Sequence, residues 1–289
     1  MILEAFAKIN WSLDICGVRD DGYHIMDMLM QPVSVSDEIT LIPSQTLSIT
    51  TDGWPPVRAD DKNLAYRAAE ALRDVTGYSA GVSVHVRKRI PVGAGMGGGS
   101  ADAAAVLIGL NHLWKTGLQN EDLEKLGLSL GADVPFFIRG GLTRTRGIGE
   151  KLEDLDCLYD YRLIVVQPCS GLSTAQVFRL WHNTQSICRP DTDKALHALK
   201  NGQLVSLCES IGNVLQPVAE SLRPEIHQAC QFIKELGALN AIMTGSGSAV
   251  FGVFSSETAS KKAFQALKKR YKTIFLCHTQ HDSIRFIQE

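Results

Sequence analysis

The stretch Pro91-Val-Gly-Ala-Gly-Met-Gly-Gly-Gly-Ser-Ala-Asp102 places five glycines within seven residues, between a segment typical of a strand and one typical of a helix. Residues 81–90 alternate apolar and polar side chains, which is the pattern of a strand. After the glycines, apolar residues recur at the spacing of one helix face: Ala103, Val106, Leu107, Leu110, Leu113 and Trp114. Glycine lets the backbone approach a ligand closely, and the N–H groups of a helix start attract anions. The sequence therefore predicts a phosphate-binding loop over residues 93–99.

Three other interpretations of this loop fit less well. A Walker A loop requires Gly-Lys-Ser/Thr after the glycines, and this sequence has none there. Gly93-x-Gly95-x-x-Gly98 matches the dinucleotide fingerprint, but four basic side chains stand between residues 85 and 89, whereas a buried parallel strand is almost entirely apolar. A flexible surface loop would have little reason to keep so many glycines, because each one costs backbone entropy on folding.

The composition is that of an ordinary globular protein and excludes a disordered or fibrous chain. The chain has 289 residues, of which 45% are hydrophobic and 21% charged. Lys and Arg number 29 and Asp and Glu 31, giving a net charge of −2. Such a balance gives no global electrostatic reason to bind nucleic acid or an anionic membrane, so we expect neither partner.

The cysteines and the N-terminus indicate a reduced, cytoplasmic protein. The cysteine count, seven, is odd, and the spacings are not those of a disulfide framework or a zinc site. The eight histidines show no metal-binding spacing either, so no protein-held metal is expected. The first eight residues include Glu4 and Lys8, unlike a signal peptide. The long uncharged segment Leu236–Ser256 has glycines at its centre, which predicts a strand, a turn and a strand rather than a membrane span.

Strands and helices occur in both halves of the chain without strict alternation, which favours the α+β class. The expected strands lie near residues 8–15, 25–35, 38–43, 46–51, 81–90, 161–167, 239–243, 249–254 and 273–277. The expected helices cover residues 62–75, the segment after residue 99, and residues 121–130, 174–182, 192–199, 203–211, 223–236 and 257–270. We place a domain boundary near residue 155, which divides the chain into residues 1–155 and 156–289.

Four segments, in order, resemble the GHMP kinases, the superfamily of galactokinase, homoserine kinase and mevalonate kinase. They are Ala7-Lys-Ile-Asn10, Pro91-Val-Gly-Ala-Gly-Met-Gly-Gly-Gly-Ser100, Gly131-Ala-Asp-Val-Pro135 and Thr244-Gly-Ser-Gly-Ser-Ala249. The resemblance implies a nucleotide-binding N-terminal half like domain 2 of ribosomal protein S5, a ferredoxin-like C-terminal half, and an active site in the cleft between them. Together with Asp21-Gly-Tyr-His24 and Leu130, these segments are similar to the members that phosphorylate the 2-hydroxyl of 4-diphosphocytidyl-2-C-methyl-D-erythritol in the non-mevalonate isoprenoid pathway.

Phosphoryl transfer to an alcohol needs a phosphate cradle, a cation and a carboxylate that orients or deprotonates the hydroxyl. Lys8 and Asp133 supply the last two kinds of group. The resemblance implies that Asp133 is the catalytic base and Lys8 its partner, and a neighbouring ammonium would lower the pKa of the Asp133 carboxyl. Two simpler interpretations remain open. A lysine on an alternating strand is usually solvated, and Asp133 can cap a short helix or turn.

The resemblance also implies the binding residues and the cofactors. ATP, with Mg²⁺ arriving on it, would be held by Pro91, Val92, Gly93, Ala94, Gly95, Met96, Gly97, Gly98, Gly99, Ser100 and Ala101. A small-molecule substrate carrying a cytidine diphosphate group would be held by Asn10, Tyr23, His24, Thr174 and Phe178. In this arrangement Tyr23 and Phe178 stack on the two faces of the cytosine, while His24 hydrogen-bonds its edge.

Simpler roles exist for several of these residues. Phe178 is also what the core side of a helix would carry, and Tyr23 suits an exposed hairpin. Thr244-Gly-Ser-Gly247 suits an ordinary turn between two strands, although the resemblance implies that it packs against the phosphate loop.

The chain departs from the family's pattern at two places. Asn213-Val-Leu-Gln216 stands where the family often has an Asn-Asp-x-Glu-like run, and Ser100 is followed by Ala101-Asp102 rather than by Ser or Asn. Neither departure touches Lys8 or Asp133. The rival functions are a kinase for another acceptor, such as homoserine or a mevalonate derivative, and a nucleotide-binding regulatory protein that has lost turnover.

Overall fold

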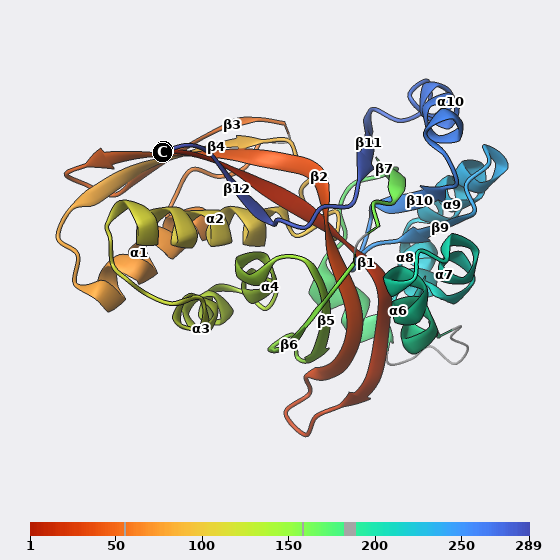
Figure 1. Ribbon diagram of the computed structural model, residues 1–289, viewed down its shortest axis with the longest axis horizontal. Helices are drawn as coiled ribbons and strands as arrows, with labels where there is room; N and C mark the ends of the chain where they lie inside the picture. The colour runs from red at the N-terminus through yellow and green to blue at the C-terminus, as the bar shows by residue number, and fades with distance from the viewer. Residues whose placement is uncertain (55, 158, 182–188) are drawn as a thin grey trace.

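A computed structural model describes residues 1–54, 56–157, 159–181 and 189–289. Its strands form two sheets; in Figure 1 the first extends from the left to the centre of the molecule and the second lies at the right. The first sheet has the order β12-β1-β2-β4-β3, with β5, β6 and β8 attached at its side, and the second has the order β11-β7-β10-β9.

The strands of the first sheet are β1 (Ile2–Val18), β2 (His24–Ser44), β3 (Ser48–Gly53), β4 (Gly81–Lys88), β5 (Leu142–Gly147), β6 (Lys151–Leu155), β8 (Gly212–Asn213) and β12 (Ile284–Gln288). Those of the second sheet are β7 (Arg162–Gln167), β9 (Asn240–Met243), β10 (Val250–Phe254) and β11 (Thr273–His278).

Strand β1 runs through both hydrophobic cores of the protein. Register shifts relative to β2 at Phe6/Ala7 and at Asn10/Ser12 mark bulges, which bend and twist a strand. As a result, Leu13 and Trp11 join different hydrophobic cores, and each core contains residues of both sheets. The polar side chains of Lys8, Asn10 and Ser12 are buried as well, whereas Asp14 is partly exposed, so most of the polar face expected for residues 8–15 lies inside the protein.

Helices α1 (Leu64–Thr76), α2 (Gly98–Leu113), α3 (Asn120–Leu130) and α4 (Val134–Arg139) cover one side of the first sheet (Figure 1). Helix α2 is the central one, because it packs against β1 and β2 as well as against the other three helices. Its buried residues run almost without interruption from Ala101 to Leu110. The glycine-rich loop that leads into α2 is thus anchored on one side by a buried helix.

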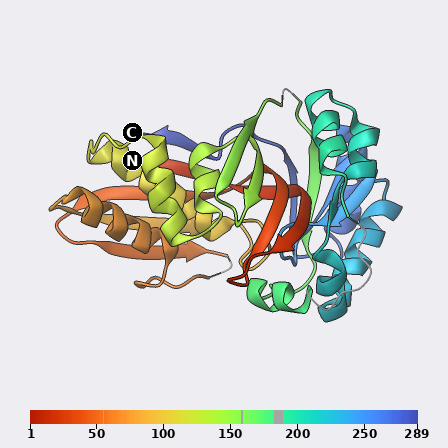
Figure 2. The same ribbon diagram turned by 90° about the horizontal axis from the view of Figure 1, so that it is seen from below.

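The second sheet carries the remaining helices: α5 (Thr174–Trp181), α6 (Thr192–Lys200), α7 (Leu204–Ser210), α8 (Gln216–Leu222), α9 (Pro224–Glu235) and α10 (Glu257–Leu267). The uncharged segment 236–256 forms β9, a glycine turn and β10, as expected, and none of the described helices is long and apolar enough to span a membrane. The chain then returns to the first sheet, where β12 pairs with β1, and the two termini lie side by side in Figure 2. The boundary near residue 155 stays a prediction.

Candidate active site

A cavity of about 640 Å³ opens between the two halves of the molecule. Its lining includes residues 91–100 of the glycine-rich loop, together with Lys8, Asn10, Tyr23, His24, Asp133, Thr174 and Phe178. The structure therefore brings together all the candidate site residues except Ala101. Ala101 is fully buried within α2, and its N–H donates to the carbonyl of Gly97.

The glycine-rich loop takes a backbone path that requires glycine. Gly93, Gly95 and Gly97 have φ values of 63°, 77° and 75°, in the left-handed region that L side chains rarely adopt. A Cβ on Gly95 would overlap the backbone carbonyl of Thr244, so the turn after β9 packs directly on the loop. Gly97 occupies the N-cap position of α2, where no side chain caps the helix. This end of a 16-residue helix faces the cavity and suits an anion.

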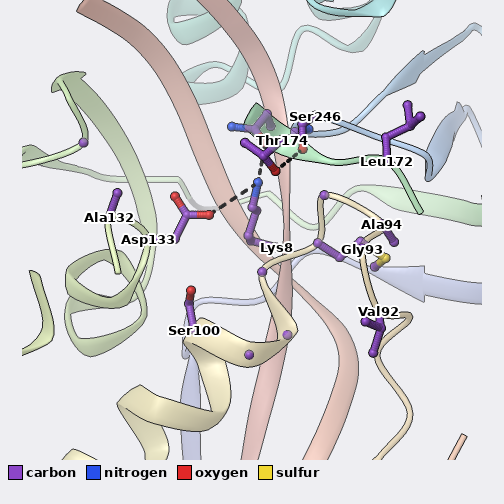
Figure 3. Close-up of a pocket in the computed structure, with 18 of the residues that line it drawn as sticks. Lys8, Val92, Gly93, Ala94, Ser100, Ala132, Asp133, Leu172, Thr174 and Ser246 are labelled. Atoms are coloured by element: carbon purple, nitrogen blue, oxygen red, sulfur yellow. Dashed lines mark hydrogen bonds and ion pairs between the residues drawn. The ribbon is translucent and has the colours of Figure 1, made fainter. Parts of the chain in front are cut away.

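Lys8 and Asp133 approach each other across the cavity above the loop (Figure 3). The Lys8 Nζ lies 4.0 Å from Asp133 Oδ2. Lys8 is only 3% exposed; burial lowers its pKa, and the negative charge of Asp133 partly opposes that shift. The alternative interpretation of Lys8 as a solvated surface lysine is therefore wrong.

Asp133 occupies the N-cap position of α4, yet its carboxylate makes no capping hydrogen bond. Its side chain is 38% exposed and lines the cavity. Asp133 thus stands where a capping aspartate would stand, but its carboxylate is available to a ligand.

Asn10 holds the Lys8 ammonium in place. Its Oδ1 accepts hydrogen bonds from Lys8 Nζ at 2.6 Å, from the Gly245 N–H at 3.0 Å and from Thr244 Oγ1 at 3.3 Å. The backbone N–H of Asn10 donates in turn to Thr244 Oγ1 at 3.0 Å. Because three donors fix one carbonyl oxygen, the position of Lys8 depends on the turn at residues 244–247, which comes from the other half of the chain.

The segment that departs from the family's pattern supports this same turn from behind. Asn213 Nδ2 donates to the carbonyls of Met243 at 2.9 Å and Gly245 at 2.8 Å. Gln216 Oε1 accepts from the Met243 N–H at 2.9 Å. Sequence reasoning missed this role, because these contacts span about thirty residues and follow no local pattern. The interpretation of residues 244–247 as an isolated hairpin turn is incomplete, since the turn contacts both the phosphate loop and Asn10.

Aromatic side chains from both halves meet at the cavity. The ring of His24, which begins β2, has its centroid 5.0 Å from that of Phe178 and 5.8 Å from that of Trp181, both on α5. Tyr23 lies beside them and is 61% exposed. Thr174 Oγ1 is 2.8 Å from Ser246 Oγ, which ties the start of α5 to the turn after β9. Phe178 is partly buried against the core, yet it also lines the cavity. Sequence reasoning did not single out Trp181.

Comparisons with known proteins match both halves of the chain to one family. The model of the GHMP kinases N terminal domain matches residues 63–141, and the GHMP kinases C terminal model matches residues 195–273. The chain belongs to the GHMP kinase family. It is a small-molecule kinase, and GHMP kinases use ATP as phosphate donor.

Three proteins are similar to the chain over nearly its full length. It is 41% identical to the 4-diphosphocytidyl-2-C-methyl-D-erythritol kinase of Alkaliphilus metalliredigens, over 95% of this chain and 94% of that protein. It is 35% identical to the Clostridium tetani kinase of the same name, over 96% of this chain and all of that protein. A crystal structure of 4-(cytidine 5'-diphospho)-2C-methyl-D-erythritol kinase superposes with a TM-score of 0.82 at 32% identity, covering 96% of this chain and 99% of the other.

A solved structure of lower sequence identity is evidence for the fold alone. The homoserine kinase of Cytophaga hutchinsonii has a TM-score of 0.73 at 18% identity, covering 99% of this chain and 96% of that chain. The α+β kinase fold and the family expected from the sequence are thus confirmed. The roles of the individual site residues stay predictions.

Proposed function

We propose that this GHMP kinase transfers the γ-phosphate of ATP to the 2-hydroxyl of 4-diphosphocytidyl-2-C-methyl-D-erythritol. One observation carries the proposal: a single cavity is lined by a glycine-rich loop, by the Lys8–Asp133 pair and by Tyr23, His24 and Phe178. These groups suit a triphosphate, a reacting hydroxyl and a planar base, respectively. The names of the relatives at 35% to 41% identity support the same acceptor.

The loop and the start of α2 would hold the phosphates of ATP. Backbone N–H groups at a helix N-terminus bind phosphate oxygens, and the helix dipole favours their negative charge. The positive φ values of Gly93, Gly95 and Gly97 let this backbone approach the ligand without side chains in the way. The loop therefore supplies position and charge stabilisation rather than a reacting group.

Asp133 and Lys8 would act on the acceptor. Asp133 accepts the proton of the 2-hydroxyl as its oxygen forms a bond to the γ-phosphorus, while the bond to the β-phosphate oxygen breaks and ADP leaves. The Lys8 ammonium stabilises the negative charge that spreads over the transferred group. Because Asn10 Oδ1 fixes that ammonium before substrate binds, little reorganisation is needed during the reaction.

Mg²⁺ accompanies ATP in this proposal. It prefers oxygen ligands, keeps several waters and is usually held by substrate phosphates with one or two protein groups. The cavity offers the Ser100 hydroxyl and the Asp133 carboxylate, and the residues that the structure describes contain no cluster of three or more metal-binding side chains. This donor set fits an ion held mainly by ATP, which when bound would neutralise phosphate charge.

The cytidine end is the most specific part of the proposal. Tyr23 would stack on one face of the cytosine and Phe178 on the other, with His24 at the edge of the base and Thr174 nearby. We also propose a cytoplasmic location, supported by the six cysteines within the described residues, all of them free thiols.

The test compares two acceptors in wild type and in Tyr23→Ala. ADP release is measured with 4-diphosphocytidyl-2-C-methyl-D-erythritol and with the same polyol phosphate lacking its cytidine. Loss of one stacking partner costs about 1–3 kcal/mol, which corresponds to a rise in KM of about 5- to 150-fold for the full substrate. The KM for ATP and for the truncated acceptor should stay near wild type. Tyr159→Ala serves as the control, because Tyr159 is also an exposed tyrosine but does not line the cavity.

Each rival function has its own outcome in this assay. Equal weakening of both acceptors, or wild-type turnover of homoserine or mevalonate phosphate at the same rate, would refute the substrate and leave the kinase intact. ATP binding without turnover of any acceptor would indicate the regulatory protein.

A further inference from the structure

Three charged side chains lie buried beneath the phosphate loop and take no part in the reaction described above. Asp37 is fully buried, Lys88 is 3% exposed and Asp102 is 4% exposed. The Lys88 ammonium donates to Asp37 Oδ2 and, at 2.7 Å, to Asp102 Oδ2. Burying charged groups is unfavourable unless they are well paired, so a cluster of this kind calls for a physical reason.

The cluster joins the two ends of the phosphate loop. Lys88 is the last residue of β4, and Asp102 lies in the second turn of α2, so their hydrogen bond closes the chain segment that contains the loop. Asp37, on the neighbouring strand β2, also accepts from the N–H groups of Arg89 at 2.6 Å and Ile90 at 2.9 Å, the first two residues after β4. One carboxylate therefore fixes the direction in which the chain leaves the strand.

The ammonium also lies close to the place where phosphate would bind. A Cβ built on Gly98, the first residue of α2, would be 3.2 Å from Lys88 Nζ, and Lys88 lines the cavity. A shift of α2 relative to β4 would therefore change the spacing between the N–H groups of the helix start and the Lys88 ammonium. The pKa shifts of these side chains also indicate that they interact strongly with one another. Burial raises the pKa of Asp102, whereas the two carboxylates outweigh the effect of burial on Lys88 and raise its pKa.

We infer that Asp37, Lys88 and Asp102 form a clasp that holds the two ends of the phosphate loop at the spacing that ATP requires. They are positioning residues for ATP binding and do not touch the acceptor. The inference rests on the proposed binding of the ATP phosphates by residues 93–100. Its characteristic consequence is selective: loosening the clasp impairs binding of the donor and spares both the acceptor and the chemical step at saturating ATP.

The test replaces Asp102, because the Asp37–Lys88 pair then remains intact and neutral overall. In Asp102→Ala the link to α2 is lost, and we expect the Kd and KM for ATP to rise at least about tenfold, since misplacement of a binding group by about 1 Å is this costly. In Asp102→Asn the carboxamide oxygen still accepts from Lys88 Nζ, so ATP binding should remain within about threefold of wild type. The KM for the acceptor and kcat at saturating ATP should change less than about twofold in both variants.

Glu124→Ala is the matched control. It also removes a carboxylate from an ion pair between two elements, because Glu124 on α3 binds Arg139 on α4 in a bidentate pair at 2.9 and 2.7 Å, and neither residue lines the cavity. Nucleotide binding is measured by titration calorimetry with ATP, and folding by the thermal midpoint. If Asp102→Ala is poorly folded, Asp102→Ser takes its place, since its hydroxyl is too short to reach Lys88.

Three results would overturn the clasp: ATP binding in Asp102→Ala equal to that in Glu124→Ala, an equal loss in Asp102→Ala and Asp102→Asn, or a parallel rise in the acceptor KM. Gly99→Val separates this failure from a failure of the proposed function, because Gly99 lines the cavity and its added Cβ would meet the Leu64 side chain at 3.5 Å rather than the clasp. If that substitution in the loop itself leaves ATP binding unchanged, the loop does not bind the phosphates; if it weakens binding while Asp102→Ala does not, only the clasp is refuted.

Discussion

Replacement of Lys8 by Met removes one charge from the centre of the site while keeping most of the side-chain volume. In the folded protein the ammonium lies 4.0 Å from Asp133 Oδ2 and donates to Asn10 Oδ1. Two unit charges at this distance interact by about 4 kcal/mol when the effective dielectric constant is about 20. Because the Asp133 side chain is 38% exposed, solvent screening reduces this value. In the proposed reaction the same ammonium faces the negative charge of the transferred group, and an attraction of this order would be lost from the transition state. We therefore expect a loss of about 2–3 kcal/mol, or about 10²-fold in kcat.

The pH profile gives this prediction a second readout. Burial lowers the pKa of Lys8 below its ordinary value of 10.5, with Asp133 opposing the shift. The charged form that the reaction needs is present below the folded-state pKa and is lost as pH rises through it. In wild type, kcat/KM should therefore fall at alkaline pH, before an unperturbed lysine would titrate. Lys8→Met should lack this alkaline limb.

Initial rates of ADP release at saturating ATP, from pH 6 to pH 10, measure both effects. The Lys8→Met protein should fold normally, since it no longer buries a cation. Asp133→Asn, made alone and combined with Lys8→Met, shows whether the two act as a unit, because the double variant should then lose less than the product of the single losses. If Lys8→Met keeps more than about a third of wild-type kcat, or keeps the alkaline limb, the role assigned to Lys8 is incorrect.

Two further predictions concern the loop and its clasp. In Gly95→Ala the added Cβ would overlap the Thr244 carbonyl, and residue 95 has a positive φ of 77° that alanine rarely adopts. Calorimetry should therefore show weaker ATP binding, with the affinity for the acceptor retained. Unchanged ATP affinity would count against the packing of the turn on the loop. For Asp102, burial raises the pKa in the folded chain above its ordinary value of 3.8. The folded chain therefore keeps a proton that the unfolded chain has already released, and the free energy of unfolding falls as pH rises through that interval. Asp102→Asn should therefore gain thermal stability relative to wild type between pH 6 and pH 8, and a constant difference in thermal midpoint would contradict the shifted pKa.

The sequence predicts most of the long elements because their periodicity is strong, whereas the short ones follow no clear period. Helix α4 has six residues, Val134 to Arg139, and five of them are buried, so it has no polar face to reveal its period. Strand β12 was not expected because it is short and largely exposed, and because its pairing with β1 joins the two ends of the chain. Pairings of this kind depend on the tertiary fold and not on local sequence.

The residues of the candidate site could be predicted where the backbone path requires glycine or where a sequence motif is present. The glycines of residues 93–99 indicate close approach of backbone to a ligand, and the structure gives Gly93, Gly95 and Gly97 positive φ. Lys8 shows the limit of pattern reasoning. Alternation correctly assigned it to a polar face, but the period of a strand does not say whether that face meets water or, as here, another part of the protein.

The alternation of residues 81–90 holds information about Lys88 that the sequence prediction did not use. Together with the neighbouring basic residues, Lys88 served only as evidence against a buried parallel strand. The period of two places residue 88 on the same face as Val82, Val84 and Val86, all of which are fully buried. A lysine on an apolar face needs a buried partner, and the structure supplies two in the carboxylates of Asp37 and Asp102.

The departure at Gln216 is compensated within the chain by the hydrogen-bonding capacity of its amide side chain. Gln216 accepts from the Met243 N–H and also donates, at 2.7 Å, to Glu220 Oε1. A glutamate at position 216 could accept from Met243, but its carboxylate would then face that of Glu220 across a hydrogen-bond distance. Gln216 and Glu220 thus form a matched pair. Since the Met243 N–H supports the turn that holds Asn10 and hence Lys8, this amide preserves the geometry of the site without a negative charge at position 216.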